Sequence, residues 1–219
     1  MVETDSGVPS PDGPSVDHSH DVYTLANIIT VLRLMLVPFA FAVFISGKND
    51  MLAFLLFALA ASTDWLDGQI ARRTGTVTEI GKAIDPLVDR LLLAAGVLGL
   101  YIEERVPLWV VLFLLARDVY LLVGAAYLAK RGVSRLPVIF TGKLTTLLLL
   151  VGFAGLILGV PEMPGLGVVE SQALPGFGAD PVVVWMWFVY AGIVASAITA
   201  VVYTSQAFTA LRAKGAVVT

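Results

Sequence analysis

The sequence contains no cysteine, only two histidines and few charged residues. Without cysteine, disulfide bonds and thiolate chemistry are excluded, and the ligands that zinc prefers are scarce. Charged residues make up 14% of the 219 positions, whereas a soluble domain has about 25%. The formal net charge of −3 gives no basic surface, so binding of nucleic acid is not predicted. An ordinary soluble enzyme is excluded by the same composition.

Apolar residues dominate what is present: they form 58% of the chain, and the mean hydropathy is +0.87. The polar, acidic residues 1–22 are predicted to be a disordered tail, and residues 23–214 one helical domain. From Tyr23 onward the apolar runs are about 20 residues long, which suffices for a helix to cross a bilayer core of about 30 Å. The sequence therefore predicts an all-α integral membrane protein with six transmembrane helices in one bundle, at 24–46, 51–71, 80–102, 107–129, 139–160 and 182–210.

Loop charges predict the orientation of these spans. Cytoplasmic loops are enriched in lysine and arginine. One set of span ends has seven cations, and the other has only Lys48 and Arg105. We therefore expect a multi-pass protein of the cell membrane with both termini in the cytoplasm, and residues 162–180 as an external connector. The seven cations are Arg72, Arg73, Lys130, Arg131, Arg135, Arg212 and Lys214.

Four aspartates occupy the predicted cytoplasmic ends of the second and third spans. Asp64 and Asp67 are three residues apart and Asp85 and Asp89 are four apart, so each pair shares a helix face. The short connection between the spans makes them antiparallel neighbours, which brings all four carboxylates to one membrane boundary. Carboxylates this close raise one another's pKa or hold a cation, and carboxylate oxygens suit Mg²⁺ or Mn²⁺. Ions held in this way typically clamp phosphate oxygens.

The residues between the aspartates suit a phosphate ligand. Gly68 allows close approach of the backbone, Ala71 is small, and Arg72 can form two hydrogen bonds with a phosphate. Gly81 allows the third helix to approach the second closely. For each glycine alone, helix packing is the alternative explanation.

The complete pattern, D-x2-D-G-x2-A-R-x8-G-x3-D-x3-D over residues 64–89, resembles the signature of the CDP-alcohol phosphatidyltransferases, and in its flanks the phosphatidylglycerophosphate and cardiolipin synthases. This resemblance implies transfer of a phosphatidyl group from CDP-diacylglycerol to an alcohol with release of CMP, by a homodimer that uses Mg²⁺ or Mn²⁺. It also implies roles by position: Asp89 as general base for the acceptor hydroxyl, a metal site at Asp64, Asp67, Asp85 and Asp89, and a donor-nucleotide site at Gly68, Ala71, Arg72 and Gly81.

The acceptor is predicted to be a glycerol-type alcohol. The flanks favour glycerol-3-phosphate, whereas the pair Arg117-Asp118 resembles the cardiolipin synthases, whose acceptor is phosphatidylglycerol. Because either acceptor carries a phosphate, Arg117, Arg135 and Lys143 are its candidate ligands. The alternative for Arg117 is a buried ion pair with a nearby carboxylate, although the adjacent Asp118 points about 100° away on an ideal helix.

Two other classes of protein also place acidic residues in membranes. A membrane prenyltransferase uses aspartates, Mg²⁺ and a diphosphate, but the Asp-Gly-x2-Ala-Arg core differs. An ion-coupled transporter places its acidic site near the midplane and has internal repeats, whereas these aspartates lie near one boundary. Release of CMP rather than pyrophosphate distinguishes the predicted enzyme from a prenyltransferase.

Overall fold

The computed structural model describes residues 25–74, 79–133, 139–169 and 171–215, with side chains for 32–63, 90–133, 139–169 and 171–212. This part of the chain contains six helices, and each of them coincides closely with one of the six predicted spans. The predicted tail, residues 1–22, lies outside the described residues. The helices are α1 (Leu25–Ile45), α2 (Asp50–Thr74), α3 (Glu79–Ile102), α4 (Leu108–Lys130), α5 (Phe140–Leu158) and α6 (Met186–Gly215).

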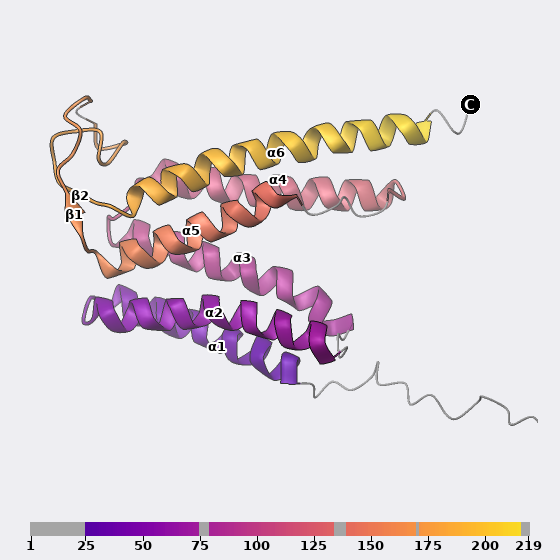
Figure 1. Ribbon diagram of the computed structural model, residues 1–219, viewed down its shortest axis with the longest axis horizontal. Coiled ribbons are helices and arrows are strands. Elements are labelled where there is room, and N and C mark those ends of the chain that lie inside the picture. The colour runs from indigo at the N-terminus through magenta and orange to yellow at the C-terminus, as the bar shows by residue number, and fades with distance from the viewer. Residues whose placement is uncertain (1–24, 75–78, 134–138, 170, 216–219) are drawn as a thin grey trace, which may run out of the picture.

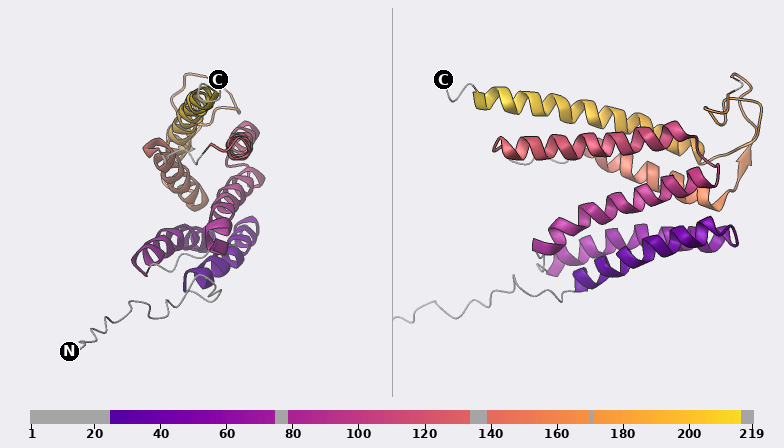
Figure 2. Two further views of the ribbon diagram at one scale, coloured as in Figure 1. Left: turned by 90° about the vertical axis from the view of Figure 1, so that its right-hand side faces the viewer. Right: turned by 180° about the vertical axis from the view of Figure 1, so that it is seen from behind.

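Consecutive helices run in opposite directions, so the bundle has two ends (Figure 1). The end where α2 and α4 finish and α3 and α5 begin is called the motif end below. The opposite end, which carries two short strands, is called the hairpin end. Seen along the helices, α3 lies between the α1–α2 pair and the group formed by α4, α5 and α6 (Figure 2).

Local chemistry sets the helix boundaries at the hairpin end. The Asn49 side chain accepts a hydrogen bond from Leu52 N at 2.9 Å, which caps the start of α2. Pro107 precedes α4 with an extended backbone. Gly159 ends α5 with φ of +76°, a conformation that glycine adopts without steric cost.

Within the part of the chain that the structure describes, three helical segments are long and apolar enough to cross a membrane: Leu108–Lys130, Phe140–Leu158 and Met186–Arg212. The apolar parts of α1, α2 and α3 are shorter, Leu32–Ile45, Asp50–Thr63 and Arg90–Ile102. In α2 and α3 the remaining turns carry the charged motif residues. The structure thus supports a mostly helical membrane protein with three candidate spans, and a six-span bundle remains a prediction.

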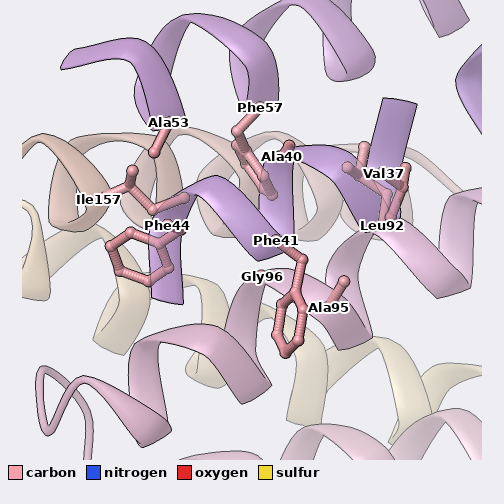
Figure 3. Close-up of a pocket in the computed structure, with 10 residues that line it drawn as sticks. All are labelled: Val37, Ala40, Phe41, Phe44, Ala53, Phe57, Leu92, Ala95, Gly96 and Ile157. Atoms are coloured by element: carbon pink, nitrogen blue, oxygen red, sulfur yellow. The ribbon is translucent and has the colours of Figure 1, made fainter. Parts of the chain in front are cut away.

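The apolar core of the first half lies where α1, α2, α3 and α5 meet (Figure 3). Val37, Ala40 and Phe44 project from one face of α1 and are at most 4% exposed. Phe57 from α2 reaches Gly96 of α3, where an added Cβ would lie 2.9 Å from the Phe57 ring. The glycine therefore permits a close contact between α2 and α3, as in other membrane helix pairs.

The second half is centred on the contact between α5 and α6. At Gly152 an added Cβ would lie 2.9 Å from Val189, and at Gly192 it would lie 2.8 Å from Leu149. Gly155 lies directly against the ring of Trp185. These three glycines bring the two backbones close together, which increases dispersion contacts where no water is available to drive association.

The segment between α5 and α6 has more structure than the predicted connector. β1 (Glu162–Met163) and β2 (Val182–Val183) pair antiparallel. Trp109 of α4 stacks on Tyr190 of α6 with ring centroids 6.3 Å apart, and its indole N–H donates to Ala173 O at 2.6 Å. The segment is thus fixed to the ends of α4 and α6.

Candidate active site

The aspartate motif lies on two neighbouring helices at the motif end. The last turns of α2 contain Asp64, Asp67, Gly68, Ala71 and Arg72, and the first turns of α3 contain Gly81, Asp85 and Asp89. Both segments are helical, as predicted, so each aspartate pair occupies one face of its helix. The side chains of these eight residues lie outside the described set. Their roles as ligands and base therefore remain predictions.

Arg33 of α1 is a buried cation near this end. It is 1% exposed and lies one turn before Val37, on the face of α1 that packs against α2 and α3. A guanidinium removed from water is costly unless it is paired or hydrogen-bonded, and Arg33 does make a polar or electrostatic interaction within the bundle. The sequence shows an arginine in an apolar span but does not reveal on which face it lies.

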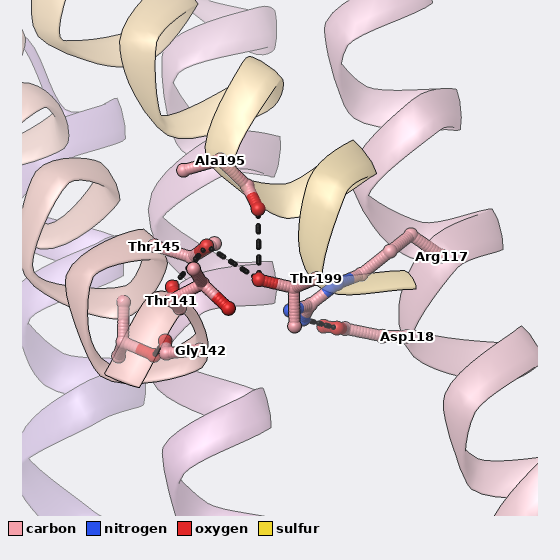
Figure 4. A network of polar contacts seen from close by, with 8 residues as sticks. Arg117, Asp118, Thr141, Gly142, Thr145, Ala195 and Thr199 are labelled. Atoms are coloured by element: carbon pink, nitrogen blue, oxygen red, sulfur yellow. Dashed lines mark hydrogen bonds and ion pairs between the residues drawn. The ribbon is translucent and has the colours of Figure 1, made fainter. Parts of the chain in front are cut away.

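A second polar region lies between α4, α5 and α6 (Figure 4). Arg117 donates from Nη1 to Asp118 Oδ1 at 2.6 Å, and the two side chains are 17% and 22% exposed. The structure thus shows the ion pair that was the alternative explanation for Arg117, and a divergence of about 100° on an ideal helix does not prevent this contact. The long arginine side chain bends back to the neighbouring carboxylate, because an unpaired charge within the bundle would be more costly.

Hydroxyl groups from α5 and α6 continue this polar region. Thr145 and Thr199, at most 1% exposed, have their Oγ1 atoms 3.4 Å apart. Five buried polar atoms of α4, α5 and α6 have no hydrogen-bond partner among the described residues. Trp187 Nε1 lies at the hairpin end of α6, and the other four are Arg117 Nε, Thr141 Oγ1, Ser196 Oγ and Gln206 Oε1. Buried polar atoms are nearly always hydrogen-bonded, so such atoms indicate a place for water or a polar ligand.

Ser196, Thr199 and Gln206 were not predicted as site residues. Their positions, with Tyr203 between the last two, repeat at intervals of three and four residues, which places them on one face of α6. This polar stripe within an apolar span was the available signal. It was missed because hydroxyl groups in membrane helices often bond only their own backbone, as Thr199 also does to Ala195 O at 2.8 Å.

The other two predicted acceptor ligands have different outcomes. Lys143 lies in the first turn of α5 with an exposed side chain, two residues before buried Thr145 and hence on the other side of the helix. It does not join the cluster of Arg117 and the threonines. Arg135 lies outside the described residues.

The two polar regions belong to one half each of the bundle. α3 connects them, because its first turns carry Asp85 and Asp89 and its middle packs against α4 and α5. The arrangement places an acidic motif on α2 and α3, and a cation with hydroxyl groups on α4, α5 and α6. Such a pair of regions fits a transfer reaction between a phosphate-containing donor and a hydroxyl-bearing acceptor at a membrane.

The fold and these two regions define a class, that of mostly helical membrane proteins with charged and polar groups between their helices. Residues 23–198 match the family CDP-alcohol phosphatidyltransferase, and the chain belongs to this family. This membership supports the phosphatidyltransferase interpretation over a prenyltransferase or a transporter, and makes the protein a transferase of phospholipid synthesis.

Curated relatives carry two different names. A Streptomyces coelicolor protein named cardiolipin synthase (CMP-forming) is 35% identical over 181 residues, which are 77% of this chain and 84% of that protein. A Pseudomonas fluorescens protein named CDP-diacylglycerol–glycerol-3-phosphate 3-phosphatidyltransferase is 36% identical over 116 residues, 51% of this chain and 59% of that protein. These similarities support the predicted branch of the family, and they do not distinguish its two acceptors.

Proposed function

We propose that this protein transfers the phosphatidyl group of CDP-diacylglycerol to a glycerol-type alcohol that carries a phosphate, and releases CMP. The observation that carries the proposal is the complete eight-residue motif on the adjacent ends of α2 and α3, in a chain of this family. The acceptor oxygen attacks the phosphatidyl phosphorus. The bond from that phosphorus to the CMP oxygen breaks, CMP leaves, and the hydroxyl proton passes to a carboxylate.

The donor set of the motif fits a hard divalent cation. Asp64, Asp67, Asp85 and Asp89 offer only carboxylate oxygens, which Mg²⁺ and Mn²⁺ prefer. When bound, such a cation neutralises charge that develops on the donor diphosphate. Family membership supports dependence on a divalent metal.

Asp89 and the four other motif residues also have roles apart from binding a metal. Asp89 accepts the proton of the acceptor hydroxyl, because a carboxylate within hydrogen-bond reach is a competent general base. Gly68, Ala71 and Gly81 leave space for the donor nucleotide on α2 and α3, and Arg72 binds a phosphate oxygen.

Arg33 supports the same site from α1. Four carboxylates at one membrane boundary repel one another, and a buried guanidinium on the helix packed against α2 and α3 lowers that repulsion. We therefore assign Arg33 as a positioning residue. Its effect acts through the aspartates rather than on the substrate.

The acceptor phosphate is assigned to the second polar region. Arg117 still has the unpartnered Nε, and the hydroxyl groups of Ser196 and Thr199 can bond the polar atoms of a glycerol head group. Arg135 and Lys143 would attract the anionic acceptor from the membrane surface.

We also propose the arrangement in the cell. An even number of spans, six, puts both termini on one side of the membrane, and the loop cations make this the cytoplasmic side, where the active site also lies. The family resemblance implies a homodimer. Residues 23–214 would then be the catalytic domain, with 1–22 as a polar tail.

The test is CMP release by the purified protein from CDP-diacylglycerol, with Mg²⁺ or Mn²⁺ and one acceptor at a time. Glycerol-3-phosphate, phosphatidylglycerol, inositol phosphate and serine are the acceptors to compare. Acceptor-dependent CMP release with either glycerol-type alcohol supports the proposal, and CMP release with serine or inositol phosphate alone contradicts it.

A further inference from the structure

The segment between α5 and α6 presents apolar side chains to its surroundings on a folded loop. Leu166 is 53% exposed and Val168 is 71% exposed, and Val169 next to them is exposed as well. Leu166 N donates to Gly176 O at 2.9 Å. Val168 N and Val169 N both donate to Phe177 O, at 2.8 and 3.0 Å. These three side chains, called the apolar tip below, are therefore held outward by the backbone of the loop.

Aromatic side chains attach this loop to the ends of α4 and α6. Trp109 donates to Ala173 O, and Tyr190 Oη donates to Pro175 O at 3.0 Å. The ring of Phe177 lies edge-on to that of Tyr190, with centroids 5.7 Å apart. Tryptophan and tyrosine gather at the level of the lipid head groups, because their rings are apolar and their N–H and O–H groups are polar. The base of the loop therefore lies at a membrane interface.

The position of the loop in the fold brings the apolar tip close to lipid. α5 and α6, which the loop joins, are both long and apolar enough to span a membrane. The loop extends sideways beyond the first turns of α6, away from the other helices (Figure 1 and Figure 2). The outward face of α6 is apolar and exposed there, with Val194 60% exposed. Lipid that covers this face of α6 lies directly beneath the loop.

We propose that the apolar tip inserts into the lipid leaflet at the hairpin end, so that the segment 162–180 is docked on the membrane surface. The tip is covered by the acyl region just below the head groups. Residues 162–180 contain three acidic residues and no lysine or arginine, so anionic head groups do not attract the segment. Apolar area alone drives this insertion. The inference does not depend on the reaction that the protein catalyses.

Insertion of the tip fixes the depth of α6 in the membrane. α6 has 30 residues and is about 45 Å long, whereas a bilayer core is about 30 Å thick. A helix with such surplus length can tilt or shift along the membrane normal. With Met186 held at the hairpin-end boundary, Gln206 lies about 30 Å further along the helix, at the motif-end boundary. The surplus turns then project on the side of the aspartate motif.

Single cysteines test the insertion, because the chain has no cysteine of its own. Val168→Cys places a thiol in the apolar tip. Gln172→Cys, at an exposed position of the same segment, is the matched control. Each full-length protein is placed in phosphatidylcholine nanodiscs, whose two faces are both open to solution. The rate of labelling by a membrane-impermeant maleimide is measured first. A fluorophore on the same thiol is then exposed to phosphatidylcholine with a quenching doxyl group near its head group.

Val168→Cys should be labelled about tenfold more slowly than Gln172→Cys, the factor expected when a side chain of this size is taken out of water. Raising the salt concentration should not change this ratio, because no cation holds the segment to the lipid. The two rates should become equal in denaturant. Doxyl lipid should quench the fluorophore at position 168 strongly and the one at position 172 weakly.

Three outcomes would overturn the inference. Equal labelling rates in nanodiscs would show that the tip lies in water. Slow labelling without quenching by doxyl lipid would show that protein, such as a second copy of this chain, covers the tip. A rate ratio that falls with salt would contradict insertion by apolar area. Leu166→Cys repeats the measurement at a second position of the tip, so the test does not depend on one variant.

Discussion

Arg105 and Asp50 join three parts of the hairpin end. The Arg105 Nη2 atom lies 2.5 Å from Asp50 Oδ2 at the start of α2. Its Nη1 atom donates to Leu156 O and Ile157 O, both at 2.8 Å, at the end of α5. One side chain from the α3–α4 turn thus neutralises a carboxylate and satisfies carbonyl groups that a helix terminus leaves without partners.

Loss of this side chain should weaken the fold more than it affects catalysis. Arg105→Ala removes the partners of two carbonyl groups and of one carboxylate, at a cost of about 1–3 kcal/mol in the free energy of unfolding. We expect a lower midpoint of thermal unfolding in detergent, with KM for the donor unchanged. Lys48→Ala, which removes an exposed cation at the same end, is the control. An equal shift in both proteins would contradict the role of Arg105.

The proposed general base gives the sharpest test of the motif. Asp89→Asn keeps the size of the side chain but cannot accept the hydroxyl proton. We expect turnover to fall about 10²–10⁴-fold while CDP-diacylglycerol still binds, measured by CMP release and by binding of labelled donor. Asp180→Asn, on the exposed segment between α5 and α6, should have full activity. Full activity in the Asp89 variant would remove Asp89 as the base.

Metal removal tests the four aspartates together. A chelator should reduce CMP release to background, and Mg²⁺ or Mn²⁺ should restore it, because the donor diphosphate needs its charge neutralised. Binding of Mn²⁺ should also raise the thermal midpoint of the wild-type protein, but not that of the double variant Asp64→Asn, Asp67→Asn. Turnover that persists in chelator would contradict the metal assignment.

The Arg117–Asp118 pair can be tested for a role beyond packing. Arg117→Ala leaves the partly buried Asp118 carboxylate without its partner. The free energy of unfolding should fall by about 3 kcal/mol at most, the lower end of the range for a fully buried pair, because both side chains are partly exposed. The double variant Arg117→Met, Asp118→Leu removes both charges and should recover the thermal midpoint.

Activity of the double variant then separates two roles of the pair. If the pair binds the acceptor, the recovered protein should bind CDP-diacylglycerol normally and have a raised KM for the acceptor. Recovery of both stability and acceptor KM would make the pair purely structural.

The absence of cysteine allows a direct test of orientation. Single cysteines introduced at Gln172 and Lys130 lie on opposite ends of the bundle, and both positions are exposed. A membrane-impermeant maleimide should label Gln172→Cys on intact cells and Lys130→Cys only after the membrane is opened. Labelling of Lys130→Cys on intact cells would reverse the proposed topology.

Sequence patterns predicted the helices well because each is a long apolar run between charged or glycine-rich turns. The predicted runs 107–129 and 139–160 correspond to α4 at Leu108–Lys130 and α5 at Phe140–Leu158. The segment from 162 to 180 was predicted less well. Its two strands pair residues about 20 positions apart, and its hydrogen bond from Trp109 to Ala173 O joins residues 64 positions apart. No local sequence pattern predicts such contacts.

The motif was predictable because its spacing alone determines which residues share a helix face. The acceptor region was only partly predictable. Arg117 stood out as a charge in an apolar run, but its pairing with Asp118 depends on how the arginine side chain bends. Ser196 and Gln206 carry no charge, so their burial without partners became visible only when α4, α5 and α6 were packed together.

The sequence by itself determined that this protein lies in a membrane, where its helices run and which chemistry its motif offers. These features follow from hydropathy, helical period and the spacing of carboxylates, which are local properties of the chain. The tertiary structure alone decided which apolar faces meet and where Arg33 is buried. It also decided that Arg105 pairs with Asp50 and donates hydrogen bonds to the end of α5. These features depend on contacts between helices distant in the chain, and such contacts follow from shape and packing rather than from any single segment.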